Sequence, residues 1–262
     1  MEAHRAARLP SAKATCESKG LAEMLRLLIA RLCRGARNRE LLDAALRADA
    51  CALRALLDSG ADPNTHDWNG VTPLMAAALQ GQRHIAEILL NAGARVDARS
   101  KLGWTALTSA VVKGRREMSE LLLSVGADPS APSGNWKSLL IHTVSKNHLE
   151  IARLLLGAGA DPDPRDEQGW TPLMRAAAQG DTEAVTVLLD AEADPRIPCH
   201  DGVTALMRAA THGSEDVVRL LLKAGADPRV KDKWERTAGT RADACGHAEL
   251  SALLGQATQR EG

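Results

Sequence analysis

The chain repeats itself every 33 residues. A hydroxyl side chain recurs at that interval in one register, at Thr72, Thr105, Ser138, Thr171, Thr204 and Thr237. A second register carries alanine, at Ala61, Ala94, Ala127, Ala160, Ala193 and Ala226. Self-similarity at a period of about 20–50 residues indicates stacked supersecondary units. We therefore expect an elongated array that acts through an extended surface rather than through a pocket inside one core.

Each unit can be interpreted as a turn followed by two helices. In residues 67–99, Thr72 suits the N-cap of a helix and is followed by proline, which suits the first helical position. Apolar residues then recur at helical spacing. Gly81 ends the first helix because glycine readily adopts the left-handed conformation, and Gly93 ends the second.

Two units depart from this glycine pattern. Asn147 stands where the other full units have the glycine that ends the first helix, and asparagine also tolerates the left-handed conformation. Glu192 replaces the glycine that ends the second helix. Asn147 is therefore predicted to keep the backbone geometry of the glycine, and Glu192 is an exception to its register.

The repeated residues resemble the ankyrin repeat. The family's pattern is matched by Asp67, Gly70, Thr72-Pro73-Leu74, Ala77-Ala78, Gly81, Leu89-Leu90 and Gly93-Ala94. The resemblance covers roughly residues 38–254 and implies an all-α fold with short hairpin turns, a solenoid of stacked helix-turn-helix units. The family's histidine after Thr-Pro-Leu is replaced throughout, by Met75, Thr108, Ile141, Met174, Met207 and Thr240. Because that histidine usually ties adjacent loops together, we expect the hairpin fingers to be less firmly clamped here.

The registers divide the chain into segments. A degenerate N-terminal cap (38–66) and a degenerate C-terminal cap (232–254) enclose full repeats at 67–99, 100–132, 133–165, 166–198 and 199–231. Solenoid ends need such atypical repeats because one face of each meets water. Residues 255–262 are expected to be a frayed tail.

The N-terminal segment, residues 1–37, differs from the rest. Residues 1–39 carry nine Lys/Arg against three Asp/Glu, whereas the whole chain has a formal net charge of zero. One amphipathic helix is expected here, with a stripe of Leu21, Leu25, Leu28 and Leu32. Two interpretations stay open: a helix that packs on the first repeat, or an organelle presequence, because such presequences are rich in arginine and poor in acids.

The sequence offers no motif for catalysis, cofactor binding or metal binding, so we do not expect an enzyme. Its five cysteines are odd in number and scattered, which favours reduced thiols and an intracellular, cytoplasmic location over a disulfide framework. No apolar run is long enough to span a membrane. We expect a monomer.

Aromatic residues are confined to the turns. The chain has no Phe or Tyr, and its five tryptophans all precede the hydroxyl register, at Trp68, Trp104, Trp136, Trp170 and Trp234. Tryptophan is enriched among the residues that dominate binding energy at interfaces. The alternative is that each indole packs against the next finger and replaces the missing histidine. Trp104 and Trp170 share one register and are the stronger candidates for partner contacts.

A second candidate feature is a basic ladder along the first helices of the repeats. Residues predicted to face away from the core include Lys113, His142, Lys146, Arg175, Arg208, His212 and Arg241. Stacking would align the run from His142 to Arg241, so that an acidic segment could offer a carboxylate to each arginine, with His142 adding charge in mild acid. The alternative is a solvated face that discourages aggregation.

Together these features predict a protein–protein interaction scaffold or adaptor. Its partner would be a protein or peptide, with acidic groups, bound by the fingers and the concave inner-helix face. The alternative is association with nucleic acid or an anionic membrane through the basic N-terminus and the ladder. Neutral overall charge argues against that alternative, because such binding needs a dominant basic footprint.

Overall fold

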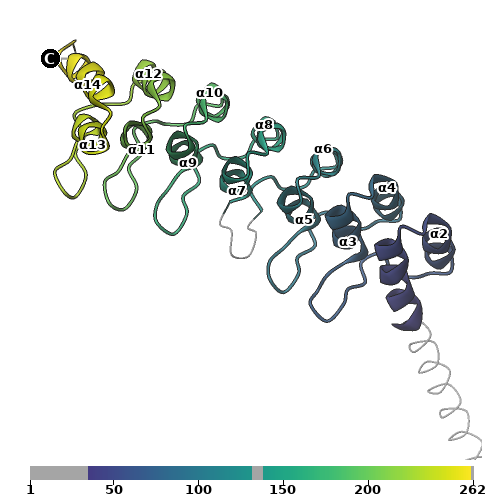
Figure 1. The fold of residues 1–262 in the computed structure, drawn as a ribbon. Helices are drawn as coiled ribbons and strands as arrows, with labels where there is room; N and C mark the ends of the chain where they lie inside the picture. The colour runs from purple at the N-terminus through teal and green to yellow at the C-terminus, as the bar shows by residue number, and fades with distance from the viewer. Residues whose placement is uncertain (1–34, 132–137, 261–262) are drawn as a thin grey trace, which may run out of the picture.

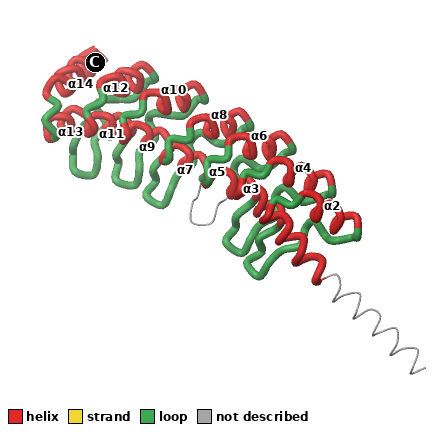
Figure 2. Tube along the Cα trace, turned by 45° about the vertical axis from the view of Figure 1, so that its right-hand side comes forward, coloured by secondary structure: helices red, strands yellow, loops and turns green. Residues whose placement is uncertain are grey.

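The computed structural model describes residues 35–131 and 138–260 of the 262-residue chain. Over these residues the fold contains helices and no strand, arranged as a single row of helix pairs with loops projecting on one side (Figures 1 and 2). This arrangement confirms the all-α solenoid. The N-terminal stripe of leucines lies outside the described residues.

The row begins with a helix over 35–47 and α2 (Ala50–Asp58). The inner helices, next to the loops, are α3 (Pro73–Gln80), α5 (Ala106–Val112), α7 (Leu139–Ser145), α9 (Pro172–Gln179), α11 (Ala205–His212) and α13 (Ala238–Ala244). The outer helices are α4 (Arg83–Asn91), α6 (Arg116–Ser124), α8 (Leu149–Gly157), α10 (Thr182–Asp190), α12 (Glu215–Lys223) and α14 (Ala248–Arg260).

The hydroxyl register begins each inner helix. Thr72 Oγ1 accepts a hydrogen bond from Met75 N at 3.3 Å, and the same bond recurs between Thr171 and Met174. Such a cap satisfies one backbone N–H that the first helical turn leaves unpaired. Left-handed residues follow the inner helices as predicted, including Asn147 at φ 57°.

The core is made of small side chains on the inner helices and leucines on the outer ones. Alanine pairs such as Ala77 and Ala78 on α3 are fully buried, which lets successive inner helices approach closely. The outer helices bury one leucine each in a common register, at Leu89, Leu122, Leu155, Leu188, Leu221 and Leu254. Each repeat therefore packs on its neighbours, and the core extends along the whole row.

Both ends of the array differ from the expected boundaries. The first helix runs through residue 38, where the N-terminal cap was expected to begin, and Asn38 Oδ1 accepts a hydrogen bond from Asp62 N at 3.1 Å. At the other end, α14 continues to Arg260, so the prediction of a frayed tail from residue 255 was wrong for 255–260. The helix persists because Leu250 and Leu254 are buried in the core, where α14 packs against α13.

Candidate functional site

The loops before the inner helices form ordered fingers, over residues 59–72, 92–105, 158–171, 191–204 and 224–237. In three of them an aspartate closes the turn. Asp67 Oδ1 accepts hydrogen bonds from the backbone N–H groups of Asn69 and Val71, both at 2.8 Å. Asp166 and Asp232 repeat this arrangement. Aspartate favours such turns because its side chain can bond to the backbone two residues on.

Backbone hydrogen bonds also join neighbouring fingers. Lys101 N donates to Asn69 O at 2.8 Å. Farther along the row, His200 N donates to Gln168 O at 3.1 Å and Lys233 N to Asp201 O at 3.0 Å. These bonds join the fingers through backbone atoms and do not involve the position where the family has histidine, so the looser clamping stays a prediction.

The tryptophans occupy different environments. Trp68 is 80 % exposed and Trp234 is 56 % exposed, whereas Trp104 and Trp170 are half-buried. Trp136 lies outside the described residues. Finger side chains alternate in direction, so tryptophans at different offsets cannot all face one way.

Trp170 serves as a platform for two arginines of the basic ladder. The guanidinium carbon of Arg208 lies 3.8 Å from the centre of the Trp170 ring, and that of Arg175 lies 4.3 Å from it. Both distances are well within the range of a cation–π interaction. The indole therefore fixes the inner-helix arginines of two successive repeats.

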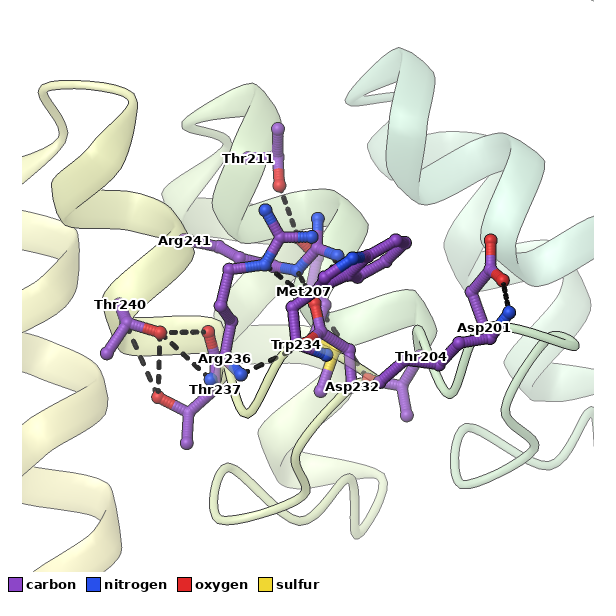
Figure 3. A network of polar contacts seen from close by, with 11 residues as sticks. Asp201, Thr204, Met207, Thr211, Asp232, Trp234, Arg236, Thr237, Thr240 and Arg241 are labelled. Atoms are coloured by element: carbon purple, nitrogen blue, oxygen red, sulfur yellow. Dashed lines mark hydrogen bonds and ion pairs between the residues drawn. The ribbon is translucent and has the colours of Figure 1, made fainter.

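Arg175 and Arg241 are paired with the aspartates that close their own fingers. Arg175 Nη2 lies 2.6 Å from Asp166 Oδ2. Arg241 Nη2 lies 2.5 Å from Asp232 Oδ2, and Arg236 Nε lies 3.0 Å from the same oxygen (Figure 3). In both finger-and-helix pairs the acid precedes the ladder arginine by nine residues.

These contacts perturb the two carboxyl groups. Burial alone would raise the pKa of Asp232, whose side chain has no exposed surface, but hydrogen bonds from Arg236 N and the Arg241 guanidinium hold it well below its usual range. Burial likewise opposes the shift at Asp166, where Arg175 and two backbone N–H groups lower the pKa. Both aspartates are thus built to stay ionised.

Arg208 lacks this partner. Cys199 occupies the position nine residues before it and is buried, at 5 % exposure. Among the described residues, no carboxylate lies within ion-pair distance of Arg208, and its buried Nε makes no hydrogen bond. Burial lowers the pKa of Arg208, and the charges of Arg241 and Arg175 act in the same direction, whereas Cys199 raises it.

The basic ladder is not a uniform exposed face. His142 is buried, at 3 % exposure, and its pKa is lowered by burial first and then by the charges of His148 and Lys146. The prediction that His142 faces a partner and gains charge in mild acid was therefore wrong. Its position on the inner helix is also buried in the preceding repeats, at Ala76 and Ser109.

The remaining ladder positions are accessible to different degrees. Arg175 and Arg208 are half-buried, whereas Arg241 is largely buried, with 11 % of its side chain exposed. The exposed members are Lys113, Lys146 and His212. Among the residues that the structure describes, ladder arginines and finger side chains therefore meet in the C-terminal half of the array, from Arg175 onward.

Sequence reasoning missed the functional context of Asp166, Cys199 and Asp232. The available signal was the nine-residue spacing from each of them to Arg175, Arg208 and Arg241, repeated at the 33-residue period.

Within 35–131 and 138–260, no helix has the length and apolar character needed to cross a membrane. The same residues contain no group of three or more His, Cys, Asp or Glu side chains placed to hold a metal ion.

Solved structures similar to this one are ankyrin-repeat domains. One from Acinetobacter baumannii is 32 % identical, with a TM-score of 0.67, covering 71 % of this chain and 97 % of that one. The human ASB11 domain is 26 % identical, with a TM-score of 0.68, covering 82 % and 96 %. The domain of Bcl-3, a member of the IkappaB family, is 25 % identical, with a TM-score of 0.73, covering 80 % and 96 %.

A comparison with curated protein sequences gives no match. The family model for ankyrin repeats, in three copies, matches residues 41–133 and again 140–232. These two matches span most of the chain and agree with the helix pairs and capped turns described above. The chain therefore belongs to the ankyrin-repeat family, whose repeats are generally protein–protein interaction modules and typically non-enzymatic scaffolds.

Proposed function

We propose that this protein is an adaptor that binds a partner protein or peptide across its fingers and inner-helix face. The observation that carries the proposal is a pair of large apolar side chains on neighbouring fingers. Trp68 is 80 % exposed and Leu102 is 71 % exposed, and the backbone bond from Lys101 N to Asn69 O ties the two fingers together. A fixed apolar pair offers contact area without the entropy cost of ordering a mobile loop on binding.

The C-terminal fingers add a second contact region. Trp234 is 56 % exposed and stacks on Arg236, whose guanidinium carbon lies 4.6 Å from the ring centre. Tryptophan and arginine are the residue types most enriched where interfaces concentrate their binding energy. Trp104 and Trp170 belong to the same surface in this proposal, as half-buried supports rather than protruding anchors.

Association with nucleic acid or anionic membranes finds less support. Asp166 and Asp232 neutralise Arg175 and Arg241, so the C-terminal half of the ladder is not a continuous basic stripe. Polyanion binding depends on many phosphate contacts made together. Lys113 and Lys146 remain exposed, but they are only two lysines on neighbouring repeats, fewer than the many contacts that such binding needs.

Proximity labelling with the full chain tests the proposal. The double variant Trp68→Ser/Leu102→Ser should lose captured proteins that the unmodified chain retains, while its far-UV circular dichroism stays unchanged. Val125→Ser is a matched control, because Val125 is 45 % exposed but follows the outer helix α6, away from the finger tips. Identical captured sets for the double variant and the unmodified chain would refute a role for these fingers.

A further inference from the structure

One arginine in the middle of the inner-helix face carries an uncompensated charge. Arg175, Arg208 and Arg241 occupy equivalent positions on α9, α11 and α13. Asp166 pairs with Arg175 and Asp232 pairs with Arg241. Cys199 stands at the equivalent position for Arg208, nine residues before it. The three ladder arginines therefore have two carboxylates among them, one of which, Asp232, also pairs with Arg236.

Cys199 does not substitute for the missing aspartate. A thiol is a weak hydrogen-bonding group with one sulfur, whereas a carboxylate has two oxygens that can pair with both ends of a guanidinium. The cysteine is buried beside Arg208, so the position is filled but carries no matching pair of acceptors. Arg208 is left with a buried Nε that makes no hydrogen bond.

The guanidinium of Arg208 is nevertheless held in place. It stacks at 3.8 Å on Trp170, and the same ring supports Arg175. Arg208 remains half-buried rather than enclosed, so a ligand can reach it from the inner-helix face. A fixed, partly desolvated cation binds an anion more strongly than a mobile, fully solvated one.

We infer that Arg208 receives a single carboxylate side chain, an aspartate or glutamate of the bound partner, as that partner crosses α9, α11 and α13. The partner's carboxylate supplies from outside what Asp166 and Asp232 supply within their own repeats. Because Arg175 and Arg241 are already paired, this surface selects a partner with one acidic residue at a defined position. The sequence alone predicts one partner carboxylate for each ladder arginine. This inference rests on the proposed function.

The charge balance favours a carboxylate over a phosphate group. Within the described part of the chain, Arg208 is the one arginine of the three that has no carboxylate beside it, and its charge matches the single negative charge of Asp or Glu. A phosphorylated side chain brings about −1.5 to −2 at neutral pH and would need a second free cation. The nearest candidates, Arg175 and Arg241, are engaged by their aspartates.

The decisive variant is Cys199→Asp, which restores the acid that the neighbouring repeats use. An internal carboxylate should then occupy Arg208 and compete with the partner. Cys199→Ser is the matched control, since it also removes the thiol but adds no charge. The equivalent position holds aspartate at both Asp166 and Asp232, so the fold accommodates the change, and thermal melting of both variants verifies this.

The probe is a phage-displayed library of random 12-residue peptides, panned on the full-length Cys199→Ser protein. Selected peptides should share an Asp or Glu whose replacement by Asn or Gln weakens binding about tenfold or more, as expected for a hydrogen bond to a charged group. The affinity of Cys199→Asp for the acidic peptide should be as low as the affinity of Cys199→Ser for the peptide in which Asn or Gln replaces the acid. On Cys199→Asp the same peptide replacement should have no further effect.

Two results overturn this inference alone: selected peptides that bind independently of any acid, or equal affinity of Cys199→Asp and Cys199→Ser for the acidic peptide. Both leave peptide binding, and with it the proposed function, intact. If panning on the full-length Cys199→Ser protein selects no peptide, the proposed function and this inference are overturned together.

Discussion

Replacing Glu192 by glycine should stabilise this protein. The residue ends α10 in the left-handed region, at φ 64°, where the equivalent residues of other repeats are Gly60, Gly93, Gly126, Gly159 and Gly225. A side chain there places Cβ too close to the following carbonyl, which costs roughly 1–2 kcal/mol. Glu192 is exposed and forms no ion pair within the described segments that would offset this cost.

The expected gain follows from two opposing terms. Glycine removes the left-handed penalty but loses about 0.5–1 kcal/mol more conformational entropy on folding. The net stabilisation is therefore about 0.5–1 kcal/mol, or about 2 °C in melting temperature for an array of this size. The hydrogen bond from the backbone N of residue 192 to Leu189 O, at 3.0 Å, uses no side-chain atom and is retained.

Urea unfolding followed by circular dichroism measures the change. Glu192→Ala separates the backbone effect from the loss of the carboxylate, since alanine keeps the penalty and should give no comparable gain. Gly225→Ala is the reciprocal test: its φ is 91° and a Cβ there would meet no atom within 4 Å, so any loss of stability comes from the backbone alone. If Glu192→Gly gains nothing and Gly225→Ala loses nothing, the strain argument is refuted.

Three further predictions concern charge and stacking. Asp232→Asn should lower the free energy of unfolding by about 3 kcal/mol, because it leaves the Arg241 charge buried and unpaired. The control is Asp194→Asn, which removes an exposed ion pair and should cost less than about 1 kcal/mol. Urea titration measures both variants. The pKa of Asp232 is lowered in the folded state, so its contribution to stability is present above pH 3.8 and is lost as the pH falls through the folded-state pKa. Acid unfolding should therefore be less steep in Asp232→Asn than in the unmodified chain. His142 has a linkage of the same sign in a higher pH range. Burial lowers its pKa in the folded state, so stability should fall as the pH drops below 6.5. His142→Gln should reduce that fall in melting curves recorded from pH 7 to 5. Trp170→Ala should remove the ring on which Arg175 and Arg208 stack, and so destabilise the fold by about 1–2 kcal/mol. It should also weaken the peptide binding expected at Arg208. Unchanged stability and affinity would contradict the role of Trp170 as a platform.

Most of the fold could be predicted from the sequence because each repeat marks its own turns and caps. The hydroxyl at Thr72, the left-handed position at Asn147 and the paired alanines act over one or two helical turns, and the 33-residue period repeats them. The extension of α14 could not be predicted in this way, since it depends on how α14 packs against α13 through Leu250 and Leu254.

The candidate site was only partly predictable. Helical periodicity places His142 and Arg175 in one column, but it does not report how deeply each lies between neighbouring repeats. Arg241 and Asp232 pair between a helix and a finger, and their repeated nine-residue spacing does not by itself show that the two side chains meet. The exposure of Trp68 likewise depends on where the finger turns, which its offset from the hydroxyl register does not determine.

The packing of each repeat only on its neighbours has a mechanical consequence. A tensile load applied to the two ends would peel terminal repeats one at a time, because the main contacts among the described helices join each repeat to its immediate neighbours. A folded repeat occupies about 10 Å along the row, whereas its 33 residues extend to roughly 110 Å when pulled straight. Each rupture would thus lengthen the chain by about 100 Å. A partner bound across α9, α11 and α13 would clamp three repeats into one unit and replace three small steps by a single larger one.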